Sequence, residues 1–279
     1  MLREVGNVKR KSNLRFFWVI LFLMLYWFAG TVIMSIFMNV NRKFADHYNE
    51  VASVVNVVIG FVVFILLFVF KKCITKFSVK SLISGLLVYG LPITIFCFYH
   101  IIISLKWILI EGFPSTVEQF RNSFFIIVIY YISVAFSEEI VFRSGFLEYL
   151  LPSSSSKYRL KVIFTCVYSG FLFGISHFIS LFSEPEKGLD IIILTVVLGS
   201  CIGYVFSVIF LKTKNIVVTM LLHFLWDITT YCNSIMIEDK YRYGGSYNFI
   251  HYQIPIIIIM TAMVTFILCR SKVEELALN

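Results

Sequence analysis

Residues 124–151 read FFIIVIYYISVAFSEEIVFRSGFLEYLL, an apolar stretch with two adjacent glutamates inside it. A helix needs about 20 predominantly apolar residues to span the hydrocarbon core of a bilayer, so this stretch is long enough to cross. At a rise of about 1.5 Å per residue, Glu138 lies roughly 20 Å along such a helix from either end. A charged side chain at that depth costs about 2.5–3.5 kcal/mol on insertion scales, so such residues are rare without a partner or a function.

The composition of the whole chain is that of a multi-pass membrane protein. Of its 279 residues, 59% are hydrophobic and only 14% are charged, whereas soluble domains are about 45–50% apolar and about 25% charged. The mean hydropathy is +0.88. The net charge of +8 could suggest nucleic acid, but the charges lie in short loops between apolar runs. There they act as topology signals and contact anionic lipid headgroups. We therefore expect a cell-membrane protein whose partners are lipids and no nucleic acid.

The apolar runs predict an all-α fold of about eight transmembrane helices, forming a single integral-membrane domain over residues 1–279. The remaining loops are too short to hold a soluble domain. The eight predicted spans are 14–38, 51–70, 82–110, 124–151, 162–182, 191–211, 216–232 and 249–269.

The loop charges predict how these helices are oriented. With eight spans, sixteen lysines and arginines fall in the terminal segments and loops on one side. Six fall on the other side, where they are mixed with acids. Because positively charged loops stay in the cytoplasm, both termini are predicted to be cytoplasmic.

Helix geometry separates the two glutamates of the fourth span. Glu139 and Arg143 are four residues apart, so they share a helix face and can form an ion pair. Glu138 points about 100° away from that face and lacks this partner. An unpaired carboxyl in an apolar setting suits a general base or acid. We therefore assign chemistry to Glu138 and a supporting role to Glu139 and Arg143.

Two later apolar helices carry further polar residues at membrane depth. The fifth span holds His177, with Phe173 one turn before it on the same face. The seventh span holds His223 and Asp227, again one turn apart. A carboxylate at that spacing can orient an imidazole, or bind water or a metal beside it.

These residues alone leave several interpretations open. A single membrane-embedded histidine is more often a helix–helix hydrogen-bond partner than a catalyst, and a Glu–Arg pair is more often structural. Six ionisable residues over three spans are harder to explain in this way, since each needs its own partner. They fit an enzyme and a proton- or ion-coupled carrier equally well, because both embed carboxylates and histidines.

Three short motifs on separate apolar helices carry a resemblance to a known family. In this chain they are Glu138-Glu139-x-x-x-Arg143, Phe173-x-x-x-His177 and His223-x-x-x-Asp227. In order and spacing they resemble the CPBP family of intramembrane endopeptidases, also called the Abi or CAAX-protease family. The family pattern is Glu-Glu-x-x-x-Arg, Phe-x-x-x-His and His-x-x-x-Asn or Asp. The resemblance covers residues 124–232, which would then form the catalytic core.

The resemblance implies hydrolysis of a peptide bond within or beside the membrane. Carried onto this chain, it implies that Glu138 and His177 activate the attacking water. It implies that Glu139 and Arg143 hold the geometry of the site.

The same resemblance places His223 and residue 227 against the developing oxyanion. A carboxylate at Asp227 cannot donate a hydrogen bond to an oxyanion, whereas the amide of asparagine can. Asp227 is therefore protonated, or orients His223, or helps to bind a metal, and we favour orientation of His223. We expect no cofactor. Zinc is the alternative, with His177, His223 and Glu138 as its ligands, although no motif has the His-Glu-x-x-His spacing of soluble zinc proteases.

The leading hypothesis is an intramembrane endopeptidase of glutamate type that cleaves a small membrane-associated peptide or a (lipo)protein precursor. One alternative is a bacteriocin self-immunity protein of the same family. Another, from a different class, is a non-catalytic or ion-coupled membrane carrier.

Overall fold

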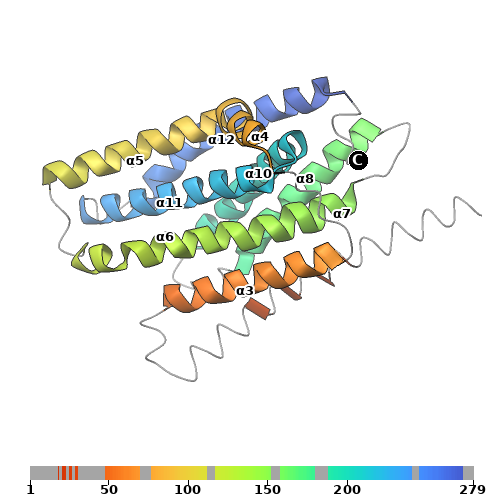
Figure 1. The fold of residues 1–279 in the computed structure, drawn as a ribbon. Helices are drawn as coiled ribbons and strands as arrows, with labels where there is room; N and C mark the ends of the chain where they lie inside the picture. Colours follow the sequence, from red (N-terminus) through yellow and green to blue (C-terminus); the bar gives the residue numbers. More distant parts are fainter. Residues whose placement is uncertain are drawn as a thin grey trace, which may run out of the picture.

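The computed structural model describes residues 48–69, 77–111, 117–151, 158–179, 188–240 and 245–272, with positions 18, 21, 22, 25, 26, 29 and 30 (Figure 1). The predicted span 14–38 thus lies almost entirely outside the described residues. Every regular element in the described ranges is helical, as the composition predicts. In chain order the elements are α3 (Tyr48–Val69), α4 (Val79–Ser84), η1 (Gly85–Tyr89), α5 (Leu91–Glu111), α6 (Val117–Glu139), η2 (Ile140–Leu147), α7 (Glu148–Leu150), α8 (Tyr158–Ser176), η3 (His177–Ile179), α10 (Leu189–Thr213), α11 (Ile216–Lys240) and α12 (Gly245–Arg270).

Several of these helices can cross a bilayer. In the described part of the chain, four helices are long and apolar enough, and one bent pair makes a fifth candidate. The protein is therefore a multi-pass membrane protein, while the count of eight spans stays a prediction. The four helices are Phe125–Leu147, Tyr158–Ser176, Leu189–Thr213 and Gln253–Arg270.

The long helices pack side by side. In Figure 1, α6 lies between α3 and α11, with α5 on the far side of α11. α8 packs along α10, and α12 packs on both α10 and α11. The segment η2, which continues α6, contacts α8, α10 and α11. The three helices that carry the sequence motifs therefore meet around η2.

The predicted third span, 82–110, is not one straight helix. Its two parts, Val79–Tyr89 and Leu91–Ser104, meet at an angle of 77°. Pro92 has no backbone N–H to continue the first helix, and it fits in the first turn of the second. At the break the N–H of Gly90 reaches back five residues to the carbonyl of Gly85, at 2.7 Å.

The glycines at this break let the chain approach α11 closely. A Cβ at Gly85 would come within 2.5 Å of Val218, and one at Gly90 within 2.7 Å of Leu222. Both contacted residues lie within two turns of His223 on α11. The bend therefore supports the helix that carries this histidine.

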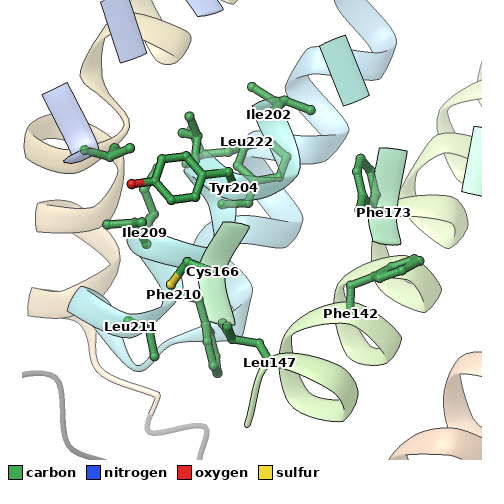
Figure 2. Packing of buried hydrophobic residues seen from close by; sticks show 14 of the residues in the cluster. Phe142, Leu147, Cys166, Phe173, Ile202, Tyr204, Ile209, Phe210, Leu211 and Leu222 are labelled. Carbon is green, nitrogen blue, oxygen red and sulfur yellow. The ribbon is translucent and has the colours of Figure 1, made fainter. Parts of the chain in front are cut away.

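The pairing of α8 with α10 also depends on small residues. A Cβ at Gly170 would come within 2.5 Å of the backbone nitrogen of Tyr204, and one at Gly203 within 2.9 Å of Phe173. Glycine at these positions lets the two helices approach, as is common between membrane helices. The approach places Phe173 against α10, where it belongs to the buried hydrophobic cluster and lies near Phe142 (Figure 2).

Polar contacts join several helix ends at one end of the bundle. Arg159 donates to the carbonyl of Ser271 at 2.9 Å, and Lys212 donates to the hydroxyl of Ser271 at 3.0 Å. Asn215 donates to the hydroxyl of Ser81 at 3.0 Å. The starts of α4, α8 and α11 and the ends of α10 and α12 therefore lie together, and we call this the basic end.

Candidate active site

The helix that carries the two glutamates changes its geometry directly after them. α6 ends at Glu139, and η2 continues as π-helix through Leu147. A π segment displaces backbone groups from the regular ladder, and such bulges are frequent at functional sites. Here the hydroxyl of Ser169 on α8 donates to the carbonyl of Phe142 at 3.3 Å. The segment is thus tied to the helix that carries Phe173 and His177.

Glu139 and Arg143 form the ion pair that their spacing predicts. Arg143 Nε lies 3.0 Å from Glu139 Oε2, and Nη2 donates to Oε1 at 3.2 Å. Both side chains are completely buried. The guanidinium also lies over the rings of Phe173 and Phe206, 5.2 and 5.8 Å from their centroids. Cation–π contacts of this kind strengthen when the cation is desolvated, so the rings and the carboxylate together stabilise the buried charge.

His223 brings three carboxylates together. Its Nδ1 lies 3.0 Å from Glu139 Oε1, and its Nε2 lies 3.3 Å from Asp227 Oδ2. Glu138 Oε2 lies 3.8 Å from the same Nε2 of His223. This distance is too long for a hydrogen bond but short enough for an electrostatic contact. The expected contact of Asp227 with His223 is present. The contact of Glu139 with His223 was missed by the sequence analysis.

The two glutamates differ sharply in exposure. The side chains of Glu139 and Arg143 are 0% exposed, and that of His223 is 5% exposed. Those of Glu138 and Asp227 are 22% and 21% exposed. A substrate or water molecule can therefore meet Glu138 and Asp227, while Glu139 and Arg143 can act only through the residues that they contact.

His177 stands at the junction of α8 and η3. Its Nδ1 lies 3.2 Å from both the hydroxyl of Ser176 and the carbonyl of Phe173. The ring of Phe173 packs edge-on against both histidines, with centroids 5.3 Å from His177 and 5.5 Å from His223. Phe173 therefore sets the spacing between the two imidazoles. The joint action of Glu138 and His177 on water stays a prediction.

Other side chains at the site were not singled out from the sequence. Phe206 of α10 packs against His223, with ring centroids 5.7 Å apart. Tyr131 of α6 and Cys97 of α5 are electrostatic neighbours of Asp227. Tyr131 lies seven positions before Glu138, which is about two helical turns, so this spacing could have indicated Tyr131. Phe206 and Cys97 have no such local signal, because they reach the site from other helices.

His177, His223 and Glu138 are the zinc ligands that the sequence offers. Among the residues that the structure describes, no group of three or more histidine, cysteine, aspartate or glutamate side chains could hold a metal ion. Both ring nitrogens of His223 face carboxylates instead of a shared empty centre. The expectation of no cofactor, with zinc on His177, His223 and Glu138 as its alternative, stays a prediction.

Comparison with known proteins points to one family. A comparison with curated proteins and one with solved structures found no match. A family model does match residues 120–229 of this chain. That range contains all three sequence motifs and every site residue that the motifs predict. The match is to a family of membrane endopeptidases, the class of enzyme that the motifs predict. Residues 120–229 of this chain match the Rce1-like family, described as type II CAAX prenyl endopeptidase Rce1-like.

Proposed function

We propose that this protein is an intramembrane endopeptidase that cleaves a small membrane-associated peptide or (lipo)protein precursor. One observation carries the proposal. Glu138 and Asp227 reach the same nitrogen of His223 from the accessible side, while Glu139 holds the other nitrogen from the buried side. Such an arrangement combines a reachable base with a fixed imidazole, which is what hydrolysis by an activated water requires.

The reaction that we propose begins at Glu138. Its carboxylate, with His177, takes a proton from water as the water oxygen bonds to the carbonyl carbon of the substrate. The carbonyl oxygen becomes an oxyanion. When the carbon–nitrogen bond breaks, Glu138 returns the proton to the leaving amine, so that one water is consumed for each peptide bond.

His223 is the group that we propose for the oxyanion. When both of its ring nitrogens are protonated, Nδ1 donates to Glu139, and Nε2, which faces Asp227 without substrate, donates to the oxyanion when the substrate carbonyl takes the place of that carboxylate. Asp227, 3.3 Å from Nε2, then balances the charge of the imidazolium. This arrangement would allow an aspartate to stand where an amide would otherwise donate, because the imidazole supplies the hydrogen bond.

We also propose that the reaction uses no metal. The support is the pairing of His223 with carboxylates on both sides, which leaves the three predicted ligands without a common centre. Activity of a purified, active sample after treatment with a chelator tests this. Full retention is expected, and a loss that zinc restores would contradict it.

The proposal includes the topology of eight spans in a single domain with both termini in the cytoplasm. The excess of basic residues in alternate loops supports it. The contacts of Arg159 and Lys212 with Ser271 add support, because they bring together three segments that the alternation assigns to one side.

Comparative peptidomics tests the function. Wild type, Glu138→Gln and the control Glu50→Gln are expressed to equal levels in the host with the endogenous gene deleted. Peptides in membranes and medium are then profiled by mass spectrometry. A peptide or trimmed terminus that needs Glu138 but not Glu50 is expected. Identical profiles, with a phenotype that the Glu138 variant still rescues, would instead favour an immunity protein or a carrier.

A further inference from the structure

We propose that Tyr26, in the N-terminal segment, is a positioning residue for Glu138, and that its hydroxyl holds the turn of α6 that carries this carboxylate. Tyr26 lies outside residues 120–229, which match the family model, and outside the three sequence motifs. The inference rests on the proposed function for the reaction that Glu138 performs. The contact between Tyr26 and α6 does not depend on that function and can be tested without a substrate.

Tyr26 and Glu138 lie at the same depth in their predicted spans. Tyr26 is twelve residues from each end of the span 14–38, which is about 18 Å at a rise of about 1.5 Å per residue. Glu138 lies roughly 20 Å from either end of the span 124–151. Tyrosine is enriched at the two membrane interfaces, and its hydroxyl usually has a hydrogen-bond partner when it is buried. A tyrosine at mid-membrane depth therefore needs a polar partner inside the bundle.

The described residues of the N-terminal segment show which face of its helix meets the bundle. Phe22 and Tyr26 are helical, lie one turn apart and pack against the buried hydrophobic cluster. The side chain of Leu25 points about 100° from that of Tyr26, and it is 54% exposed. The face that carries Tyr26 is therefore turned toward the other helices.

The hydroxyl of Tyr26 meets α6 at the residue before Glu138. Ser137 is completely buried, and its hydroxyl donates to the carbonyl of Val134 at 3.0 Å. The Ser137 side chain is also a hydrogen-bonding partner of Tyr26. Because the one proton of the serine hydroxyl goes to Val134, the serine oxygen is the acceptor and the phenol is the donor. Tyr26 is therefore linked to the last turn of α6 before Glu138.

α3 packs closely against the same turn of α6. A Cβ at Gly60 would come within 2.7 Å of the Phe136 ring and within 3.2 Å of the Cα of Ser137. The ring of Phe61 lies 5.3 Å from that of Phe136. Since Gly60 has no side chain that could donate to Ser137, α3 supports this turn by packing and Tyr26 supports it by a hydrogen bond.

Glu138 is itself a neighbour of the Tyr26 phenol. Tyr26 interacts electrostatically with Glu138 and with Tyr130, which lies earlier on α6. The contact of Glu138 Oε2 with His223 Nε2, at 3.8 Å, is too long for a hydrogen bond and does not fix the carboxylate. A general base must be held in place relative to the water that it activates. The link from Tyr26 to the turn of Glu138 supplies that constraint.

A crosslink tests the contact. The variant Tyr26→Cys/Ser137→Cys is treated in membranes with a short bifunctional thiol reagent, and bridged peptides are identified by mass spectrometry. The matched control is Leu25→Cys/Ser137→Cys, because Leu25 is exposed. The Tyr26 pair should be bridged about tenfold more than the control, since the two side chains point about 100° apart. Equal bridging of the two pairs, or none in the Tyr26 pair, would overturn the inference.

Kinetics test the role of the hydroxyl. Tyr26→Phe removes the hydroxyl and keeps the ring. Initial rates are measured on a synthetic fluorogenic peptide that spans the bond identified by the peptidomic comparison. A misplaced base slows the chemical step, so kcat should fall about 10–100-fold while KM and the midpoint of thermal unfolding stay close to wild type. The control Tyr204→Phe removes a hydroxyl that lies 3.0 Å from that of Thr265 on α12, and its kcat should not change.

A double-mutant comparison shows whether the effect passes through Ser137. Ser137→Ala alone should also lower kcat. The variant Tyr26→Phe/Ser137→Ala should lose no more activity than the larger of the two single changes, because the two hydroxyls form one link. Losses that multiply would mean that the two hydroxyls act independently, and they would contradict the link.

Two further kinetic results would overturn the inference. One is a wild-type kcat in Tyr26→Phe. The other is a loss of activity together with a lower unfolding midpoint, because Tyr26 would then support only the fold. A wild-type enzyme that releases no peptide product would instead end the proposed function. The crosslink would still decide whether Tyr26 meets α6, so the two failures are distinguishable.

Discussion

Glu138 and Glu139 are neighbours in the chain, yet they lie in opposite surroundings. Glu139 is fully buried between Arg143 and His223, whereas Glu138 is about one-fifth exposed and approaches His223 at 3.8 Å. Two adjacent residues on a helix point about 100° apart, and here that angle separates a fully buried carboxylate from a partly exposed one. One helix therefore supplies both a partly exposed carboxylate and the buried partner of His223.

The largest effect is expected when the partly exposed carboxylate, that of Glu138, is replaced. Glu138→Gln should lower the rate of product formation by about 10²–10⁴-fold, because it removes the proposed general base. The thermal stability of the variant should stay close to that of wild type, because the ion-pair contact that it loses, Glu138 Oε2 to His223 Nε2, is long at 3.8 Å. Product formation and thermal unfolding in detergent are measured together. Equal activity of the variant would contradict the assigned role.

Changes to the buried pair of Glu139 and Arg143 should lower the stability of the fold. Arg143→Met leaves the carboxylate of Glu139 buried beside His223 without its cation, and breaking such a pair costs about 3–5 kcal/mol. We expect a lower midpoint of thermal unfolding and less folded protein in the membrane, measured by size-exclusion of the detergent extract. Arg143→Lys should recover part of the stability. A stable but inactive Arg143→Met protein would instead show that Arg143 affects the reaction through Glu139 and His223 and is not needed for folding.

The packing that sets Phe173 between the histidines can be changed without touching a charge. Gly203→Ala brings a Cβ within 2.9 Å of Phe173, and overpacking of this kind costs about 1–3 kcal/mol. The matched control is Gly145→Ala in η2, whose nearest contact would be the carbonyl of Ile140 at 3.6 Å. Product formation and unfolding should change in the first variant more than in the second. The reverse order would show that the α8–α10 contact does not set the site.

The smallest effect is expected at Asp227. Asp227→Asn keeps a hydrogen-bonding group beside His223 Nε2, so product formation should stay within about tenfold of wild type, a change of about 1.4 kcal/mol. Asp227→Ala removes the group that orients the imidazole and should lose more. Rates for the two variants are compared over a range of pH. Equal loss in both would mean that the negative charge, and not orientation, is what the site needs.

Much of this site could be predicted from local spacing. Residues four apart on a helix share a face, which is why the pairs Glu139–Arg143 and His223–Asp227 were expected and are present. The contact of Glu139 with His223 joins residues 84 positions apart. Its existence depends on how α6 and α11 are rotated against each other, which no local pattern specifies.

The bend at Gly90 and the π segment after Glu139 show a second limit. The run 82–110 is apolar throughout, so hydropathy predicts one span, although Pro92 was a local reason for a break. The π segment has no such residue. Its displaced carbonyl at Phe142 is satisfied by Ser169 on another helix, so its geometry depends on a contact between helices.

The amino-acid sequence by itself determined that this protein is helical, crosses a membrane several times and carries three polar motifs at membrane depth. It did so because the hydrophobic thickness of a bilayer and the period of a helix act on neighbouring residues. Only the tertiary structure decided that His223 gathers three carboxylates, that Phe173 spaces the two histidines and that one glutamate is fully buried while its neighbour is partly exposed. Those facts depend on close packing between helices, made possible by glycines at Gly85, Gly90 and Gly203, which brings distant residues together.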